Sequence, residues 1–598
     1  MMTVGKPGAF RDNGGFSAAR RLMRRYFLRP SLFLIASYLL LSALPLLSML
    51  FGRPVAQPAL LLAATVAAWI GVWALLKRPA WFHVLLLPAF LALPVEVYLQ
   101  TYFGQGISTH HLGIIFETSP GEAFEFLGSR IWLLGGVLLL VIVWFAATWR
   151  LALKTRELDW TGASRTIALA VLGACVGLWL YEAAAAPGST RLPSWARISV
   201  NAPLLSRSWP FGTVLHLQSF WKERRYLAQL AGRSSQFQFG AHQAAGHEQP
   251  QVVVMVLGES SRADRWSLNG YTRRTNPLLE QEANLVSLSD MVTPVAATRL
   301  SVPVIMSRKP ATQSLRAGFS EKSFISAYRE AGFKTYWLSN QMTFGEFDTP
   351  VSVFAREADV TRFVNLGGFT SRSNHDDVLL APLQHAISDP APKKLIVLHT
   401  LGNHWNYSQR YPKEFDRWQP SLFGVDKPAY TNLKLKTQIN NSYDNSILYT
   451  DWLLSQVIAT LRAGPGLSAM MYVADHGQTL YDGTCKLAFH GHNTQFEFHV
   501  PALVWYSDGY RDAHPDKVAQ LVRHHNAPLA TENIFHSLLD LADIRYGTEQ
   551  LDRSIFSPLL ARQKRYVDSY GWTDYDDATF KGDCREVIAN KTPLPREK

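Results

Sequence analysis

The sequence is poor in charge for its length. Only 18% of its 598 residues are Asp, Glu, Lys or Arg, which is low for a soluble protein. Internal repeats and low-complexity tracts are also lacking, so a repeat architecture is not indicated. Cysteine is scarce, with three residues in the whole chain. The shortage of charge directs attention to where the apolar residues lie.

Apolar residues are concentrated between about Leu32 and Ala186, in runs separated by short charged stretches. Runs of about 20 apolar residues are long enough to cross a bilayer as helices. The segments that meet this criterion are Leu32–Phe51, Pro58–Leu76, Trp81–Phe103, Ile131–Trp149 and Thr166–Ala186. The alternative of buried core helices is disfavoured, because five such segments follow one another in one block. We therefore predict an N-terminal five-helix transmembrane domain.

The distribution of Lys and Arg predicts the orientation of this domain. Seven basic residues precede the first span, and the second and fourth connections carry six more. The first connection has only Arg53, and the third has Arg130 at the membrane edge. The amino terminus is therefore predicted to be cytoplasmic, and five crossings place everything after about Ala186 outside. The net charge of +12 is largely a topology signal, and we predict no nucleic-acid partner. The basic leader is too long for a cleaved signal peptide.

The segment after the membrane block is rich in Ser, Gln, Gly, Arg and Trp. The stretch LLSRSWPFGTVLHLQSFWKERRYLAQL mixes Trp and Leu with Arg and Lys, which is typical of an amphipathic helix on a membrane surface. A linker packed against the following domain would have the same composition, and the sequence leaves both readings open.

Strands and helices alternate from Val252 to roughly Leu560. The predicted strands are Val252–Leu257, Lys334–Leu338, Lys394–His399, Ala469–Ala474 and Pro501–Trp505. Helical patterns lie between them, such as SEKSFISAYREAG, in which Ser320 begins a helix and Phe324, Ala327 and Tyr328 share one face. This alternation predicts an α/β sandwich domain with a mostly parallel sheet covered on both sides.

The three cysteines fall in two predicted environments. Cys175 lies in the fifth apolar segment and is predicted to be a packing residue. Cys485 and Cys584 lie in the part that we expect to be exported, where disulfides persist. They could therefore pair, but two cysteines at this spacing do not establish a bond.

Polar residues of the kind that bind metals follow several predicted strands. In open α/β sheets, groups at the carboxyl ends of strands face the ligand crevice. Zinc favours His nitrogen and carboxylate oxygen, with one position left for the reacting group. The candidates in chain order are Glu259, Thr298, His404, Asp475 with His476, and the later His490 and His492. A carboxylate at one strand end is commonly structural, but an Asp–His pair that closes a buried strand before Gly477 indicates a metal site.

Ser260 and Ser261 offer a different reading, that of a serine hydrolase. That reading requires the pattern G-x-S-x-G at the turn after the strand. The sequence runs Gly258-Glu259-Ser260-Ser261-Arg262, with arginine in place of the second glycine. The serine-nucleophile reading therefore fails on the motif.

Four motifs together carry a family resemblance. The stretches GESSRADRWSLNGYTRRTNP, SVPVIMS, HTLGNHWNYSQRYP and VADHG resemble those of the bacterial phosphoethanolamine transferases, membrane enzymes of the alkaline phosphatase superfamily that include the mobile colistin-resistance enzymes. The resemblance covers nearly the whole chain. It implies a cytoplasmic tail at 1–30, a transmembrane domain at 31–186, a membrane-surface linker at 187–250 and a periplasmic zinc-dependent catalytic domain of the alkaline phosphatase-like type at 251–598. It also implies a multi-pass protein of the bacterial inner membrane.

The resemblance also implies a role for individual residues. Glu259 matches the zinc-binding glutamate, Asp475 and His476 match the Asp–His zinc pair, and Thr298 matches the threonine nucleophile. Thr298 would occupy the fourth position on the zinc, where coordination stabilises the alkoxide. A helix that begins at Thr298 would favour phosphoryl oxygens at its N-terminus.

Further matches concern substrate binding and a second zinc. His404 and His490 match family histidines implicated in a second zinc, in substrate binding or in proton transfer. Asn340 matches an asparagine thought to touch the substrate phosphate. Thr118 and Glu122 resemble loop residues linked to lipid binding. The resemblance thus implies one zinc ion and allows a second.

Some positions depart from the pattern of the family. The lipid A-modifying members usually flank the nucleophile with two cysteines, and here Pro294 and Val304 stand in those places. The expected loop asparagine is Ile114, and a lysine found in some members is missing from NQMTFGEFDTP. These differences leave the zinc chemistry intact and favour an acceptor in the lipopolysaccharide core or a periplasmic glucan over lipid A.

The resemblance implies a two-step transfer. Thr298 takes phosphoethanolamine from phosphatidylethanolamine through a covalent phosphothreonine-type intermediate, and an acceptor on lipopolysaccharide or a glucan then receives it. A phosphoglycerol transferase, or another phosphodiester transferase or hydrolase of the superfamily, remains an alternative, whereas a sulfatase would need Cys or Ser at the position of Thr298. A non-catalytic membrane scaffold is disfavoured, since a scaffold would not need Glu259, Thr298, Asp475 and His476 together.

Overall fold

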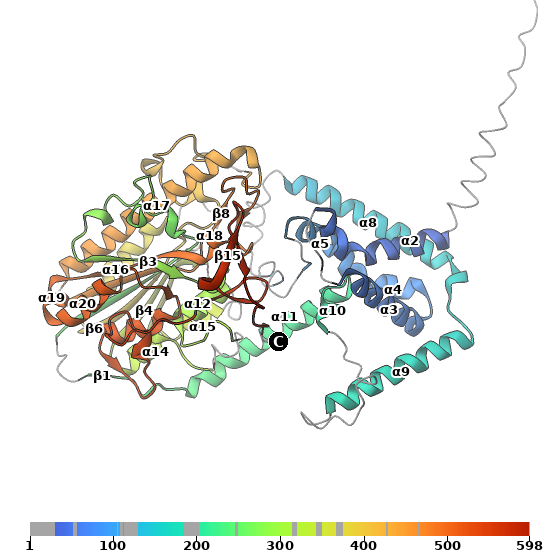
Figure 1. The fold of residues 1–598 in the computed structure, drawn as a ribbon, viewed down its shortest axis with the longest axis horizontal. Helices are drawn as coiled ribbons and strands as arrows, with labels where there is room; N and C mark the ends of the chain where they lie inside the picture. The colour runs from blue at the N-terminus through green and yellow to red at the C-terminus, as the bar shows by residue number, and fades with distance from the viewer. Residues whose placement is uncertain are drawn as a thin grey trace, which may run out of the picture. The chain divides into compact units, whose positions relative to one another are not determined.

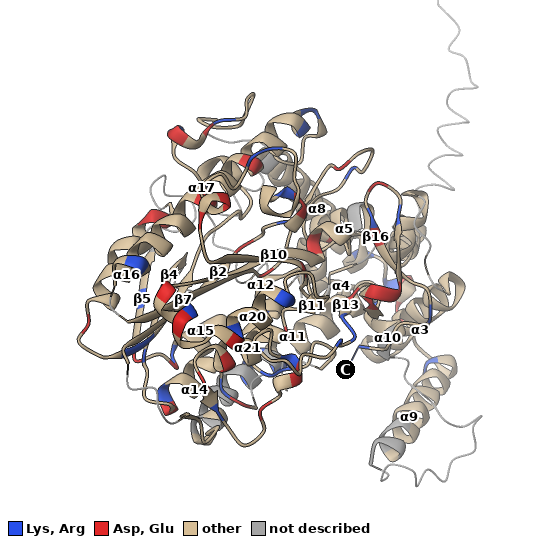
Figure 2. Cartoon of the chain, turned by 60° about the vertical axis from the view of Figure 1, so that its left-hand side comes forward, with Lys and Arg blue, Asp and Glu red and all other residues tan. Residues whose placement is uncertain are grey.

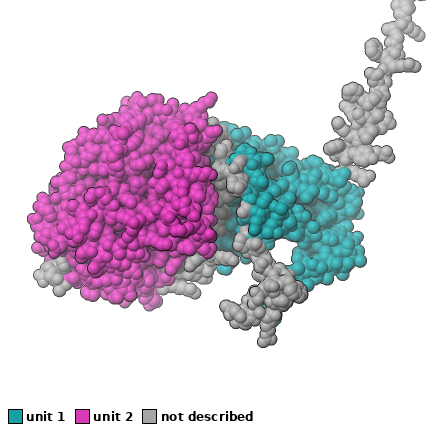
Figure 3. Space-filling model, in the orientation of Figure 1, with its two compact units in different colours: residues 1–116, 130–222 teal, residues 117–129, 223–598 magenta. Residues whose placement is uncertain are grey.

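The structure is a computed structural model of the chain. It describes residues 30–51, 55, 57–103, 106–107, 112, 116, 130–184, 202–244, 249–313, 320–342, 350–365, 375–425, 429–464 and 466–596. The chain divides into two compact units, residues 1–116 with 130–222 and residues 117–129 with 223–598 (Figure 3). The predicted boundaries at residues 30, 186 and 250 remain predictions.

The first unit consists of apolar helices (Figure 1). Its elements are α2 (Pro30–Ser42), η1 (Leu44–Phe51), α3 (Pro58–Leu76), α4 (Pro79–Leu85), α5 (Leu87–Phe103), α8 (Arg130–Lys154), α9 (Ala163–Ala184) and α10 (Ala202–Ser206). Helix α3 has no charged residue and is tan throughout in Figure 2. Aromatic side chains, among them Trp69, Phe82 and Phe90, form a buried cluster in this unit.

The predicted count of five spans is not confirmed. Within the described residues, α3 and α8 are each long and apolar enough to cross a membrane. The pairs α2–η1 and α4–α5 are each bent by 58°, and the count reaches four if each pair is one span. Pro45 and Pro88 lie just past the two bends, where a proline ring removes a backbone donor and disfavours continuation of the helix. The apolar part of α9, Ala163–Leu178, is shorter than a span.

The predicted amphipathic segment after residue 201 is helical. Helix α11 runs from Phe211 to Arg233. Its placement on a membrane surface remains a prediction.

The second unit contains an eight-stranded sheet with helices on both faces (Figure 1). The strand order is β11-β3-β10-β7-β2-β6-β4-β5. The strands are β2 (Gln251–Gly258), β3 (Leu285–Val292), β4 (Lys334–Met342), β5 (Val360–Asn365), β6 (Lys393–His399), β7 (Leu467–Ala474), β10 (His499–Tyr506) and β11 (Leu529–Ala530). Only β10 runs antiparallel to its neighbours among these strands. The predicted α/β sandwich with a mostly parallel sheet is therefore confirmed.

The centre of the sheet is the core of the second unit. All eight residues of β2 and all eight of β7 are buried, as expected for apolar strands covered on both faces. Helices α16 (Leu380–Ile387) and α17 (Lys436–Ala463) pack together, and α12 (Thr298–Met306), α14 (Phe324–Glu330), α15 (Pro350–Ala355) and α21 (Asn533–Leu541) form a second group. Further α-helices among the described residues are α18 (Gln495–Phe498), α19 (Asp508–Ala513) and α20 (Pro515–Arg523).

Helix α14 begins later than the sequence predicts. Its first residue is Phe324, and Ser323 caps it by accepting a hydrogen bond from the Ile325 amide. A serine at this position satisfies one of the donors that a helix start leaves free, which explains the shift from Ser320. The predicted apolar face is confirmed, because Phe324, Ala327 and Tyr328 are fully buried.

Short two-stranded elements surround the main sheet. They are β1 (His242–Gln243) with β12 (Ile544–Arg545), β8 (Thr479–Leu480) with β9 (Ala488–Phe489), β13 (Tyr566–Asp568) with β14 (Trp572–Asp574), and β15 (Ala578–Lys581) with β16 (Glu586–Ala589). A disulfide joins Cys485 to Cys584, so the pairing that the sequence left open is made.

Asp451 on α17 generates a prediction about pH. Its carboxylate accepts hydrogen bonds from the Leu278 and Leu279 amides, each at 3.0 Å, and burial raises its pKa to about 7. An ordinary aspartate has a pKa of about 3.9. Between about pH 4 and pH 7, Asp451 is therefore protonated in the folded protein and ionised in the unfolded chain. Its contribution to the free energy of unfolding is fully present below about pH 4 and is lost as the pH rises through about 7.

We expect the Tm of the wild-type chain to fall more steeply between about pH 5 and pH 8 than that of Asp451→Asn, measured on the detergent-solubilised chain. Asp512→Asn, which changes an exposed aspartate of α19, is the control and should follow the wild type. Equal slopes in all three proteins would contradict the assignment.

Candidate metal centre

Strand pairing brings the candidate ligands together. Strands β2 and β7 are parallel neighbours, and Gly258 lies opposite Ala474. Glu259 and Asp475 therefore leave the sheet side by side at its carboxyl edge, the edge at which ligands bind in open α/β sheets. The close packing requires glycine at position 258, where a Cβ atom would come within 2.5 Å of the Tyr472 hydroxyl oxygen.

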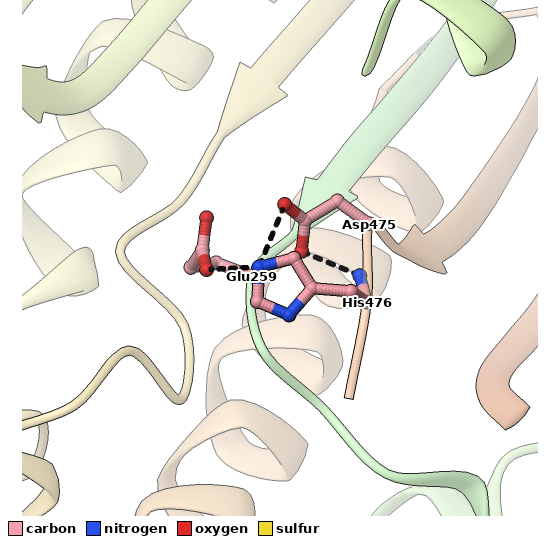
Figure 4. A group of neighbouring side chains, drawn as sticks. All are labelled: Glu259, Asp475 and His476. Atoms are coloured by element: carbon pink, nitrogen blue, oxygen red, sulfur yellow. Dashed lines mark hydrogen bonds and ion pairs between the residues drawn. The ribbon is translucent and has the colours of Figure 1, made fainter. Parts of the chain in front are cut away.

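Glu259, Asp475 and His476 form one buried cluster (Figure 4). Their relative exposures are 2%, 1% and 0%, and one ligand atom from each lies within 4.8 Å of the others. The Nε2 atom of His476 is 3.5 Å from Glu259 Oε1 and 3.6 Å from Asp475 Oδ2. The Nδ1 atom of His476 lies 2.9 Å from the Gly477 carbonyl oxygen. That contact places the proton on Nδ1 and leaves Nε2 with a lone pair directed toward the carboxylates.

The electrostatics of this cluster call for a cation. Asp475 Oδ1 accepts hydrogen bonds from the Ser260 and His476 amides, whereas Oδ2 is buried and has no hydrogen-bond partner among the described residues. Burial, together with the charge of Asp475, raises the pKa of Glu259 well above its usual range. Two buried carboxylates at this separation are unfavourable without a positive charge between them. One imidazole nitrogen and two carboxylates are a ligand set that zinc takes, so these residues fit a zinc ion.

Thr298 lies at the same cluster and opens a helix. It is the first residue of α12, and Ala297 precedes it as the N-cap. The Thr298 hydroxyl donates to Glu259 Oε2 at 3.1 Å and lies 3.5 Å from His476 Nε2. The positive end of a helix dipole also favours anionic oxygens at the helix start. The hydroxyl thus lies where the predicted nucleophile is needed.

The two serines after Glu259 support the loop. Ser260 has a positive φ of 55° and donates a 2.5 Å hydrogen bond to Glu259 Oε1. Ser261 accepts a hydrogen bond from the indole of Trp266 at 2.9 Å. Both serines are fully buried, and Ser260 orients the glutamate.

His490 and His404 differ in their surroundings. The ring centroid of His490 lies 4.3 Å from that of His476, and its Nδ1 atom is 3.3 Å from Gln478 Oε1. Burial, followed by the charges of Arg410 and His476, lowers the pKa of His404 well below its usual range. Neither histidine belongs to the three-residue cluster formed by the described residues. Their roles in proton transfer or in a second zinc site remain predictions.

Asn340 is buried and contacts a carboxylate. Its side-chain amide donates to Asp376 Oδ1 at 2.9 Å. Asp376 also accepts from the Leu401 and Gly402 amides, both at 2.8 Å. Gly402 has a φ of 49°, and a Cβ atom there would lie 2.8 Å from the Glu259 carbonyl oxygen. Asn340 therefore helps to hold the loop behind Glu259, and its contact with a substrate phosphate remains a prediction.

Several supporting residues were not found from the sequence. Arg262 is 1% exposed and pairs with Asp264 and Asp482. The Tyr443 hydroxyl donates to the Ser260 carbonyl at 2.7 Å and accepts from the Arg262 amide at 3.0 Å. A buried arginine between the two ligand-bearing loops has no local sequence signal, because its partners come from distant segments. Thr118, Glu122 and Ile114 lie outside the described residues.

Comparison with known proteins agrees with this geometry. Residues 251–544 match the sulfatase family model, so this part of the chain is a sulfatase-type domain of the alkaline phosphatase superfamily.

The chain is, more specifically, homologous to phosphoethanolamine transferases. It is 27% identical over 478 residues to phosphoethanolamine transferase EptC of Escherichia coli strain K12, which covers 78% of this chain and 80% of that protein. It is 30% identical over 342 residues to the Kdo(2)-lipid A phosphoethanolamine 7''-transferase of the same strain, which covers 55% and 57% of the two chains.

The solved structures similar to this one include the following two. The C-terminal periplasmic domain of EptC from E. coli, solved in complex with Zn, is 28% identical, with a TM-score of 0.51 over 56% of this chain and 95% of that chain. The integral membrane protein lipooligosaccharide phosphoethanolamine transferase A from Neisseria meningitidis has a TM-score of 0.64 over 87% of this chain and 97% of that chain, at 20% identity. The second comparison confirms the fold, a helical N-terminal region followed by the α/β domain.

The cluster generates a prediction about metal content. We expect the purified full-length chain to carry at least one zinc ion by elemental mass spectrometry, and Asp475→Asn to lose it because two ligands hold zinc poorly. Glu280→Gln, which changes a partly exposed carboxylate paired with Arg274, is the control and should keep the metal. A chelator should lower the Tm of the wild type and leave that of Asp475→Asn unchanged. An active wild-type preparation free of metal would refute the site.

Proposed function

We propose that the protein is a zinc-dependent transferase that moves phosphoethanolamine from phosphatidylethanolamine to lipopolysaccharide or another envelope glycan. The observation that carries this proposal is the Thr298 hydroxyl, 3.1 Å from Glu259 Oε2 and 3.5 Å from His476 Nε2 at the start of α12. Homology to named phosphoethanolamine transferases supports it. A scaffold without catalysis would not need a hydroxyl oriented on a buried cluster of metal ligands.

Glu259, Asp475 and His476 would hold the zinc ion. When bound, zinc supplies a positive charge that lowers the pKa of a coordinated hydroxyl and polarises phosphoryl oxygens. The Glu259 carboxylate orients the Thr298 hydroxyl by accepting its hydrogen bond. A threonine hydroxyl is a poor nucleophile by itself at neutral pH. Its position beside the metal ligands would therefore be what activates it for attack on phosphorus.

The first step forms a covalent enzyme intermediate. The Oγ1 atom of Thr298 attacks the phosphorus of phosphatidylethanolamine, and the bond between phosphorus and the diacylglycerol oxygen breaks. The hydroxyl proton leaves Thr298, and the departing diacylglycerol oxygen gains one. The positive end of the α12 dipole would favour the charge on the non-bridging phosphoryl oxygens during this exchange.

The second step releases phosphoethanolamine to the acceptor. An acceptor hydroxyl or phosphate oxygen attacks the phosphorus, and the bond to Thr298 Oγ1 breaks. His490, whose ring lies against that of His476, or His404 would accept the proton of the acceptor and return one to Thr298. Either histidine could instead bind the substrate or a second zinc. Asn340, Thr118 and Glu122 remain proposed substrate contacts.

The apolar helices of the first unit fit a lipid donor. Diacylglycerol stays in the bilayer when it leaves, so a membrane-anchored enzyme keeps its donor and its product in one phase. We propose that the chain is a multi-pass protein of the bacterial inner membrane with its catalytic domain in the periplasm. The disulfide between Cys485 and Cys584 agrees with an oxidising compartment.

The acceptor is the least constrained part of the proposal. One relative is named as a lipid A transferase, but Pro294 and Val304 replace the cysteine pair that the lipid A-modifying members usually have. We therefore propose the lipopolysaccharide core or a periplasmic glucan ahead of lipid A.

Thr298 is the decisive residue for the mechanism. We expect Thr298→Ala to abolish transfer while zinc content and Tm stay near those of the wild type, because the three metal ligands remain. Thr298→Ser should retain part of the activity, since it keeps the hydroxyl. Intact mass spectrometry after incubation with phosphatidylethanolamine should find an adduct on the wild type and none on Thr298→Ala. Thr579→Ala, which changes an exposed threonine of β15, is the matched control. Full activity of Thr298→Ala would refute the mechanism.

The acceptor can be identified by comparing strains. We expect mass spectrometry of lipopolysaccharide and periplasmic glucans to find phosphoethanolamine in a complemented deletion strain and to find it missing from a strain that carries Thr298→Ala. A shift on the core oligosaccharide or the glucan would agree with the proposed order of acceptors. A shift confined to lipid A would overturn that order and leave the transfer itself intact.

A further inference from the structure

A short hairpin joins the metal ligands to His490. The chain passes from Asp475 and His476 into β8, turns, and returns through β9 directly to His490. Only two residue pairs link the strands, Thr479 with Phe489 and Leu480 with Ala488. A hairpin of this size is marginally stable alone. The position of His490 therefore depends on what holds the hairpin from outside.

The tip of this hairpin is fastened to the C-terminal hairpin formed by β15 and β16. Cys485 is disulfide-bonded to Cys584. Asp583, which directly precedes Cys584, accepts hydrogen bonds from the amide and the hydroxyl of Thr484, both at 2.7 Å. One disulfide and two hydrogen bonds thus hold the tip of the hairpin at Thr484 and Cys485.

The segment after His490 is fastened to the same hairpin. Thr494 forms a β-bridge with Glu586. The Gln495 amide donates to the Arg585 carbonyl at 2.9 Å, and the Val587 amide donates to the Asn493 carbonyl at 2.9 Å. Residues 583–587 therefore hold the chain on both sides of His490.

A buried carboxylate fixes the backbone beside His490. Glu497 accepts hydrogen bonds from the amides of Gly491 and His492 at 2.8 Å and 2.9 Å. It also accepts from the hydroxyl of Thr479 at 2.6 Å. Gly491 has a φ of 88°, a conformation that glycine adopts without strain. The result is a rigid turn that presents the ring of His490, 4.3 Å from the ring of His476 between their centroids.

We propose that the C-terminal hairpin is a clamp, anchored by Cys485–Cys584 and Asp583, that positions His490 for phosphoryl transfer. Cys485, Cys584 and Asp583 are then positioning residues, since they act through His490 and touch neither the metal ligands nor Thr298. The clamp rests on the proposed function for the role of His490. A disulfide that served general stability alone would not need to lie near this histidine. Here the C-terminal hairpin contacts the chain both before His490, at Thr484 and Cys485, and after it, at residues 493–495.

The first test compares the clamp with a matched surface site. The variants are Cys485→Ser/Cys584→Ser, Asp583→Asn and, as the control, Asp577→Asn, a half-exposed carboxylate of the same C-terminal segment that pairs with Lys591. The assay follows diacylglycerol release from fluorescent phosphatidylethanolamine in detergent micelles. Full-length enzyme is used, and the acceptor is lipopolysaccharide extracted from the deletion strain. Zinc content and Tm are measured on the same preparations.

We expect kcat of the double serine variant to fall by at least about tenfold. The fall should not exceed that of His490→Ala, for which the loss of acid–base catalysis predicts a decrease on the order of 10²-fold or more. The KM for phosphatidylethanolamine and the zinc content should stay unchanged. Asp583→Asn should show a smaller loss of kcat, and Asp577→Asn none. Wild-type kcat in both clamp variants would overturn the proposal.

The second test separates positioning from general stability. In a background of His490→Ala, the clamp substitutions should cause no further loss of kcat, because residues that act through one group are not additive. Losses that multiply would show that the hairpin acts on something other than His490 and would overturn the clamp. If the double serine variant loses zinc or does not fold, the same cycle with Asp583→Asn decides. A wild-type enzyme that releases no diacylglycerol would refute the proposed function itself. The assay distinguishes that outcome from wild-type kcat in the clamp variants, which would overturn the clamp alone.

Discussion

The site in the second unit depends on two buried carboxylates that lie together, with the imidazole of His476 within 3.6 Å of both. Glu259 and Asp475 end neighbouring parallel strands, and the geometry of the sheet forces them side by side. Their mutual repulsion in a buried site is offset only in part by amide and hydroxyl donors. A bound divalent cation would resolve this conflict, and the stability of the site and its chemistry would then have the same source.

The surroundings of the cluster are built from segments far apart in the chain. Arg262 and Tyr443 connect the loop after β2 with α17 and with Asp482. Asp376 holds the loop after β6 behind Glu259. On the open side, α12 delivers Thr298, and the β8–β9 hairpin delivers His490. A catalytic group is useful only when it is held within a fraction of an ångström of its working position. The buried ion pairs and the C-terminal hairpin supply that constraint.

Much of the fold could be predicted because apolar runs report burial directly. The five predicted strands are all present, since each contains a run of apolar residues that the covered sheet buries. Strand β3 was missed because LVSLSDMV alternates polar and apolar residues beside an antiparallel partner. The predicted number of spans in the first unit is not confirmed. Apolar length alone indicates five spans, but the bends just before Pro45 and Pro88 leave two to four candidates among the described residues.

The sequence by itself supplied the candidates for the site. Strand-end carboxylates, an Asp–His pair and a threonine before an apolar stretch drew attention to Glu259, Asp475, His476 and Thr298, because residue type and strand position are local features, and the family resemblance supplied the roles expected of them. Only the tertiary structure decided which groups support them. The pairing of Cys485 with Cys584, the contact of Asn340 with Asp376 and the attachment of the His490 segment to residues 583–587 join parts of the chain separated by tens of residues or more. Such contacts follow from how the elements pack in three dimensions, and no local pattern in the sequence records them.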